Sequence, residues 1–124
     1  MRIASISENH KFEKRIAISP ETAKKYIALG LEVSLTENYA EHLGFKDSEY
    51  KELGVTILKD IKEVISYADV IVQLGLPSDE VTTLMKENQT LIGILDLYNN
   101  KEKIESLSKN KINVFSLELL PRIT

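Results

Sequence analysis

Residues 60–72, DIKEVISYADVIV, decide the fold, because they join a capped amphipathic helix directly to an apolar strand. Asp60, followed three residues later by Glu63, is typical of a capping box that opens a helix. The apolar positions 61, 64, 65 and 68 form the inner face of that helix. Val70-Ile71-Val72 is a continuous apolar run, which is typical of a parallel strand buried on both faces. The stretch therefore predicts a helix that packs on a parallel sheet.

The same alternation extends in both directions from this stretch. Ser19-Pro20-Glu21 predicts a helix start, with Ser19 as the cap and Pro20 at the first helical position, and Gly30 ends that helix. Strands are expected at 3–6, 32–35, 55–58, 70–72, 91–95 and 112–117, and helices after Ser19, near Asp47, after Asp60, after Ser78 and after Asn99 or Asn100. This pattern predicts an α/β fold: one three-layer domain with a mainly parallel sheet of about six strands and helices on both faces, flavodoxin- or Rossmann-like.

Composition limits the classes of function. The chain has 124 residues, enough for one domain with its own core, and a formal net charge of -3. That charge provides no basic surface for nucleic acid. The absence of cysteine excludes disulfides, thiolate catalysis and cysteine-ligated zinc, and it fits a reducing cytoplasm. No stretch approaches the roughly 20 apolar residues that a membrane span requires.

The glycines exclude the usual dinucleotide cradle. The spacing of Gly30, Gly44, Gly54, Gly75 and Gly93 nowhere gives G-x-G-x-x-G, and no P-loop is present. We therefore expect this domain not to be the dinucleotide-binding domain itself, although it shares the general architecture. The acidic cluster and the lysine that phosphorelay receivers require are also missing from the ends of the first and fifth strands.

Two arginines are candidate ligand-binding residues. Arg15 precedes a capped helix, where it either holds a carboxylate or phosphate through its planar fork or pairs with a nearby acid at the surface. Arg122 follows Pro121 at the carboxyl edge of the sheet, where it either contacts a nucleotide or is a charged residue near a frayed terminus. His10 and His42 lack the spacing of metal ligands, so no metal site is expected.

Several stretches together resemble a known family along essentially the whole chain. They are Met1-Arg2-Ile3, 15–21 (RIAISPE), 28–33 (ALGLEV), 44–47 (GFKD) and 68–71 (ADVI), and in this order they resemble the alanine dehydrogenase/transhydrogenase N-terminal domain. The ending 118–124 (ELLPRIT) is similar to the NAD(P) transhydrogenase alpha subunit, in which an arginine-alanine-glutamine-serine loop follows.

Two further positions distinguish the branches of this family. Alanine dehydrogenases hold their keto acid with a lysine after the fourth strand and use a catalytic histidine after the fifth. The matching positions here are Gln73 and Asp96. A neutral amide forms no ion pair with a carboxylate, and a second carboxylate repels it, so both residues argue against amino-acid oxidation.

The resemblance implies a role in hydride transfer. In the family, this half-domain packs against its own Rossmann domain, which binds NAD(H), and hydride passes to NADP+ on a partner beta subunit, coupled to proton movement by a membrane domain. Arg122 matches an arginine of the nucleotide-contacting loop, so a catalytic, positioning role is implied for Arg122 and cofactor contacts for 121–124 (Pro121, Arg122, Ile123, Thr124). Arg15 matches the arginine that binds the substrate carboxylate in alanine dehydrogenases, and with Gln73 it is a secondary candidate.

The resemblance also sets expectations for the chain as a whole. Residues 1–124 are expected to be a truncated domain, inactive alone and without NAD(H), within a homodimeric, cytoplasmic protein that is peripheral to the inner membrane through its partners. Two alternatives stay open at this point: the N-terminal domain of an amino-acid (alanine) dehydrogenase, and a non-catalytic flavodoxin-like interaction module.

Overall fold

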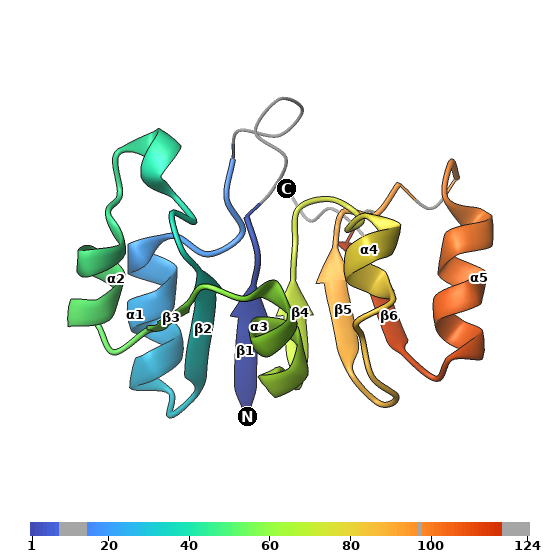
Figure 1. Cartoon of the computed structure of the whole chain (residues 1–124), viewed down its shortest axis with the longest axis horizontal. Coiled ribbons are helices and arrows are strands. Elements are labelled where there is room, and N and C mark those ends of the chain that lie inside the picture. Colours follow the sequence, from blue (N-terminus) through green and yellow to red (C-terminus); the bar gives the residue numbers. More distant parts are fainter. Residues whose placement is uncertain (8–14, 97, 118–124) are drawn as a thin grey trace, which may run out of the picture.

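The computed structural model describes residues 1–7, 15–96 and 98–117 (Figure 1). The strands are β1 (Arg2–Ser5), β2 (Glu32–Thr36), β3 (Thr56–Leu58), β4 (Val70–Val72), β5 (Thr90–Gly93) and β6 (Asn113–Ser116). The helices are α1 (Pro20–Ala28), α2 (Asp47–Glu52), α3 (Ile61–Tyr67), α4 (Asp79–Thr82) and α5 (Lys101–Lys109), with a short 3-10 helix, η1 (Glu41–Leu43).

The strands form one sheet in the order β3-β2-β1-β4-β5-β6, and every pairing is parallel. Beside one another at the centre lie β1 and β4, with Ile3 opposite Val70 and Ala4 opposite Ile71. The predicted three-layer α/β fold is thereby confirmed, and the sheet of the described residues is wholly rather than mainly parallel.

The helices divide between the two faces of the sheet, as the two hydrophobic clusters show. One cluster joins Ala23 of α1 and Tyr50 of α2 to β1 and β2. The other joins α3, α4 and α5 to the opposite face, with Val81 and Leu107 among its members. In Figure 1, α3 and α4 lie in front of the sheet and α5 lies beside β6. Side chains at alternate strand positions therefore enter different cores.

The predicted helix boundaries are confirmed where polar caps carry them. The side chain of Ser19 accepts a hydrogen bond from Thr22 N at 3.2 Å, and Gly30 lies just past the end of α1 with φ 87°. A left-handed φ of this kind favours glycine because a Cβ there strains the backbone. At α3, Asp60 Oδ1 accepts from Lys62 N at 2.9 Å.

Three local predictions are corrected. Ser78 precedes α4 but makes no capping hydrogen bond, and α4 ends at Thr82, so Leu84 lies beyond the helix rather than on it. Ile61, predicted to be on the inner face of α3, is 41% exposed because it stands at the first position of the helix, above the edge of the core. The amide of Asn100 does not cap α5 but donates to Leu95 O at 2.9 Å and Asp96 O at 3.1 Å.

Candidate functional site at the carboxyl edge of the sheet

The order of the strands marks a place for a ligand at the carboxyl ends of β1 and β4. From β1 the chain moves outward to β2 and β3, then returns across the sheet to place β4 on the other side of β1. In open α/β sheets, ligands bind in the crevice outside the carboxyl ends of strands where the strand order reverses in this way.

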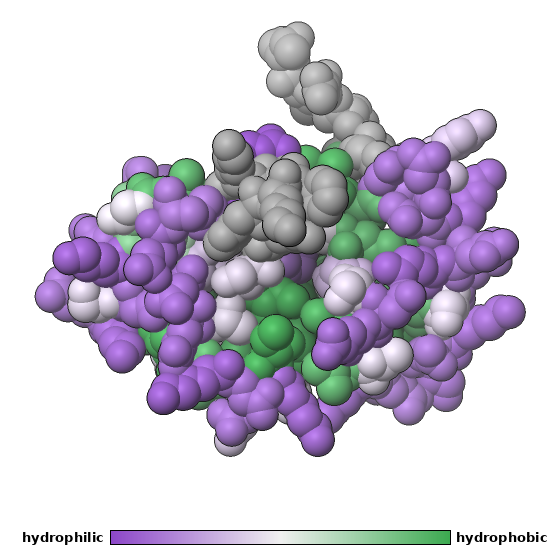
Figure 2. Space-filling view, turned by 45° about the horizontal axis from the view of Figure 1, so that its top comes forward, coloured by the Kyte–Doolittle hydropathy of each residue, from purple (hydrophilic) through white to green (hydrophobic). Residues whose placement is uncertain are grey.

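A cavity of about 670 Å³ lies at this position, between the starts of α3 and α4. Its volume falls within the roughly 300–1,000 Å³ of typical small-molecule pockets. The lining residues come from the ends of β1 and β4 and from the segments around α3 and α4: Ile6, Ser7, Lys59, Asp60, Ile61, Lys62, Gln73, Leu76, Pro77, Ser78, Glu80, Val81 and Leu84. Figure 2 shows hydrophobic side chains in the middle of this face of the molecule, surrounded by hydrophilic ones.

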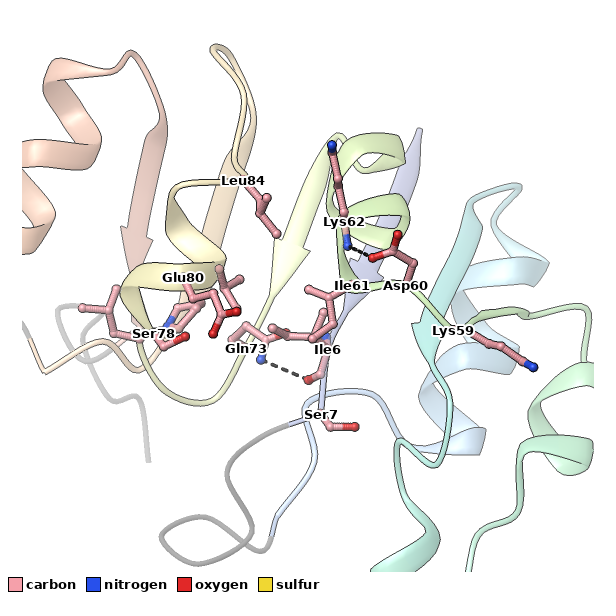
Figure 3. Close-up of a pocket in the computed structure, with 13 residues that line it drawn as sticks. Ile6, Ser7, Lys59, Asp60, Ile61, Lys62, Gln73, Ser78, Glu80 and Leu84 are labelled. Atoms are coloured by element: carbon pink, nitrogen blue, oxygen red, sulfur yellow. Dashed lines mark hydrogen bonds between the residues drawn. The ribbon is translucent and has the colours of Figure 1, made fainter.

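The charged groups lie at the margin of the cavity rather than on its floor. In Figure 3, Lys59 and Lys62 extend away from the other lining residues, whereas Leu84 and Ile61 point inward toward Gln73 and Ile6. The carboxylate of Asp60 is already engaged at the start of α3. The floor of the cavity therefore consists of apolar side chains and one neutral amide.

That amide, Gln73, joins the ends of the two central strands. Its side chain is 2% exposed; its Oε1 accepts a hydrogen bond from Ile6 N at 2.7 Å, and its Nε2 donates to Ile6 O at 3.1 Å. Because the Ile6 N–H can only donate, the carbonyl side of the amide must face it. Gln73 thus satisfies the backbone of Ile6 just beyond the end of β1, where the strand ladder stops.

A buried hydroxyl network continues from Gln73 to the segment before α1. Ser5 Oγ lies 2.9 Å from Gln73 Oε1 and 2.6 Å from Val72 O, so its single proton serves one acceptor at a time. It also lies 2.8 Å from the Tyr39 hydroxyl, which accepts from Ala17 N at 3.2 Å and Ile18 N at 3.1 Å. The backbone that follows Arg15 is therefore tied to the floor of the cavity.

Tyr50 supports the same segment from α2. Its hydroxyl donates to Ile18 O at 2.9 Å, and its ring meets that of Tyr39 edge to face with 6.1 Å between centroids. Burial, followed by the charges of Tyr39, Glu49 and Asp47, raises the pKa of Tyr50 well above its ordinary value of 10.0. The phenol is consequently a neutral donor at physiological pH.

The predicted site residues are distributed unevenly. Gln73 lines the cavity, and Arg15 is exposed at the start of a described segment. Asp96, beyond β5, is exposed with φ 51° and accepts from the Asn99 amide at 2.8 Å. Arg122 and its neighbours Pro121, Ile123 and Thr124 lie outside the described residues, as does His10.

Sequence reasoning missed the residues that organise the site, namely Ser5, Tyr39 and Tyr50. A serine inside an otherwise apolar first strand was the available signal, because a buried hydroxyl requires a partner. Nothing in the spacing indicates that Tyr39, 34 residues away from Ser5, supplies it.

Metal-binding and membrane-spanning features are both missing from the described residues. No group of three or more His, Cys, Asp or Glu side chains could hold a metal ion in the described segments of the chain. Among those same residues, no helix is long and apolar enough to cross a membrane.

The strand order and the crevice between β1 and β4 place the chain in the class of Rossmann-like, doubly wound α/β domains. Within that class, residues 5–124 match the family model described as "Alanine dehydrogenase/PNT, N-terminal domain". The chain belongs to this family.

Relatives from both branches of the family are similar to the chain. The first section of the split NAD(P) transhydrogenase alpha subunit of Rhodospirillum rubrum is 35% identical over 130 residues, which cover 100% of this chain and 34% of that protein. Alanine dehydrogenase 1 of Staphylococcus aureus is 29% identical over 107 residues, covering 86% of this chain and 28% of that one. The crystal structure of transhydrogenase from Sinorhizobium meliloti superposes with a TM-score of 0.89 at 30% identity, covering 98% of this chain and 36% of that structure. The chain thus spans about a third of the length of these relatives.

Proposed function

We propose that this chain is the N-terminal domain, residues 1–124, of the NAD(H)-binding alpha subunit of a proton-translocating NAD(P) transhydrogenase. The observation that carries the proposal is the 35% identity, over the whole chain, with the transhydrogenase alpha subunit of Rhodospirillum rubrum. The neutral floor of the cavity supports it, because Gln73 offers no positive charge to a keto-acid carboxylate.

The residues of this domain fit one side of a NAD(H) site and not the cradle for the whole dinucleotide. The chain has no G-x-G-x-x-G to let a backbone approach a pyrophosphate, so that portion of the coenzyme requires another domain. The cavity at the switch point is apolar, with an amide on its floor, which suits an uncharged aromatic ring better than a phosphate. A separate Rossmann domain of the same polypeptide would bind NAD(H), and the coenzyme would supply the hydride.

Within that arrangement, the domain orients the coenzyme. Arg122 would contact the nicotinamide half, with Pro121, Ile123 and Thr124 forming the adjoining wall. Gln73 keeps the ends of β1 and β4 together beneath it, and the hydroxyl network fixes the backbone after Arg15. Hydride transfer requires near-contact geometry, so a fixed wall accelerates it by limiting the orientations of the ring.

The proposal extends to partners and place. The NADP(H) that exchanges hydride would lie on the beta subunit, and a membrane domain would couple the exchange to proton movement. The alpha subunit would work as a homodimer on the cytoplasmic side of the inner membrane, held there by its partners. Residues 1–124 alone would neither bind NAD(H) nor transfer hydride.

Alanine oxidation is the second candidate, because alanine dehydrogenases share the family and reach 29% identity. It requires a group that binds the substrate carboxylate. At the position expected for that group stands Gln73, whose carbonyl oxygen and one amide hydrogen are already bonded to Ile6.

The deciding experiment assays the complete polypeptide, with its partner subunits, for hydride transfer from NADH to NADP+ and for NAD+-dependent alanine oxidation. We expect the first activity and not the second. Arg122→Ala should lower kcat by about 100-fold through lost orientation of the ring. The matched control is Arg2→Ala at the opposite edge of the sheet, where Arg2 pairs with Glu32 at 2.9 Å, and it should leave kcat unchanged. Alanine oxidation without transhydrogenation, or normal turnover after Arg122→Ala, would contradict the proposal.

A further inference from the structure

One region of the sheet surface has no helix over it among the described residues. On the side where α1 and α2 cover β1 and β2, the side chains of β4, β5 and β6 form a surface that we call the bare face. It consists of two rows that run across the three strands in register: Val70, Thr90 and Asn113, and then Val72, Ile92 and Phe115.

The bare face is apolar and open. Phe115, at its outer end, is 60% exposed, and Ile94 and Leu117, just beyond the strand ends, are 43% and 45% exposed. None of the six residues of the bare face carries a charge. On the other side of the same strands, Ile71 and Leu91 are fully buried under the helices. Parallel sheets occur almost only with both faces covered, so this surface lacks its cover.

We propose that an amphipathic α-helix from the remainder of the same polypeptide packs its apolar side on the bare face. This inference rests on the proposed function, in which residues 1–124 belong to a longer chain. The matched transhydrogenase alpha subunit of Rhodospirillum rubrum is about three times as long as this chain, so ample polypeptide is available for the purpose.

The dimensions of the bare face select a helix over a second copy. Neighbouring strands lie about 4.8 Å apart, so three strands span roughly 10 Å, which is the diameter of one α-helix with its side chains. With about four residues per strand at roughly 3.3 Å each, the patch measures on the order of 130 Å². A stable dimer buries about 800 Å² on each partner, so the bare face by itself is too small to hold a second copy.

Thiol labelling of the complete polypeptide tests the inference. The variant Phe115→Cys places a thiol on the bare face, and Leu29→Cys places one at the end of α1, where the native side chain is 76% exposed. With iodoacetamide, and with modification quantified on the peptides that contain each position, we expect position 115 to react at least about tenfold more slowly than position 29, because a covered side chain reacts only through local opening.

Each outcome of the labelling decides the inference. Equal rates at positions 115 and 29 would overturn it. Protection that disappears when the protein is diluted below its oligomerisation range would also overturn it, because the cover would then come from another molecule. Protection that is independent of dilution supports a helix of the same chain. The hydride-transfer assay is separate: lost activity with a protected position 115 would count against the proposed function and leave the bare-face inference standing.

Discussion

The two edges of the sheet each hold a buried glutamine, and comparing them shows what makes a buried amide a candidate site residue. Gln73, at the carboxyl edge, is 2% exposed, and Gln89, at the amino edge, is 5% exposed. At Gln89, Oε1 accepts from Lys86 N at 2.7 Å, and Nε2 donates to Ile65 O at 2.6 Å and Ala68 O at 2.9 Å. Both side chains therefore satisfy backbone groups that secondary structure leaves unpaired.

The difference lies in what else each amide faces. Gln89 closes the end of α3, whereas Gln73 lines the cavity at the switch point and contacts the hydroxyl network. Burial and hydrogen bonding alone do not separate a structural amide from one at a site. The edge of the sheet separates them, because in parallel sheets ligands bind at the carboxyl edge.

The largest effect is expected from a methyl group added beside Gln73. A Cβ on Gly93 would lie 2.2 Å from Gln73 O and 3.1 Å from Leu95 Cδ2, and backbone atoms cannot move aside as the end of a flexible side chain can. Gly93→Ala should lower the free energy of unfolding by about 3 kcal/mol, at the upper end for overpacking. Urea unfolding measures it.

Gly75, in the loop after β4, is the matched control for that substitution. A Cβ there meets nothing within 4 Å, so Gly75→Ala should change stability by less than about 0.5 kcal/mol. If the two alanine variants unfolded at the same urea concentration, the tight approach of β5 to Gln73 would not be a constraint on this edge.

The second prediction tests the comparison of the two glutamines itself. Gln73→Met and Gln89→Met keep the side-chain length but remove the polar atoms, leaving buried backbone groups unpaired. Each should cost about 2 kcal/mol of stability, measured by urea unfolding. In the complete enzyme, only Gln73→Met should also alter kcat or KM for hydride transfer at a temperature where both variants are folded. Equal kinetic effects would remove the distinction between the edges.

The sequence predicts most of the fold because local signals agree with one another. The apolar run Val70–Val72, the cap at Ser19 and the glycine at position 30 all act over a few residues, and each is confirmed. The prediction of α4 fails because Val81, Leu84 and Met85 have helical spacing, yet only the first lies within the single helical turn. Their packing against the core is satisfied without a longer helix.

The site is less accessible to sequence reasoning because its contacts are distant along the chain. Gln73 is identifiable by its position after a buried strand, but its partners Ser5 and Ile6 precede it by 68 and 67 residues. Only the folded sheet brings β1 beside β4. The proposed roles of Arg122 and Arg15 stay predictions, since they depend on a ligand and on further domains.

The smallest effect is expected at Tyr50, which supports the carboxyl edge from below. Tyr50→Phe removes the hydrogen bond to Ile18 O at 2.9 Å and should cost about 1 kcal/mol near neutral pH. The matched substitution toward the amino edge is Tyr67→Phe. Tyr67 is 60% exposed and keeps its ring 4.9 Å from the Arg2 guanidinium, so its change should stay below about 0.5 kcal/mol.

The pH dependence of the same variant sharpens this result. Burial raises the pKa of Tyr50 in the folded chain above the value of 10.0 that applies to the unfolded chain. Above about pH 10 the folded state therefore binds more protons than the unfolded state, and the free energy of unfolding falls as the pH rises. Because Tyr50→Phe removes this contribution, its stability should decline less steeply between about pH 9 and 11 than that of the native chain. Parallel declines in urea unfolding across that range would show that the phenol ionises as readily in the folded chain as in the unfolded one, and that the hydroxyl network is open to water.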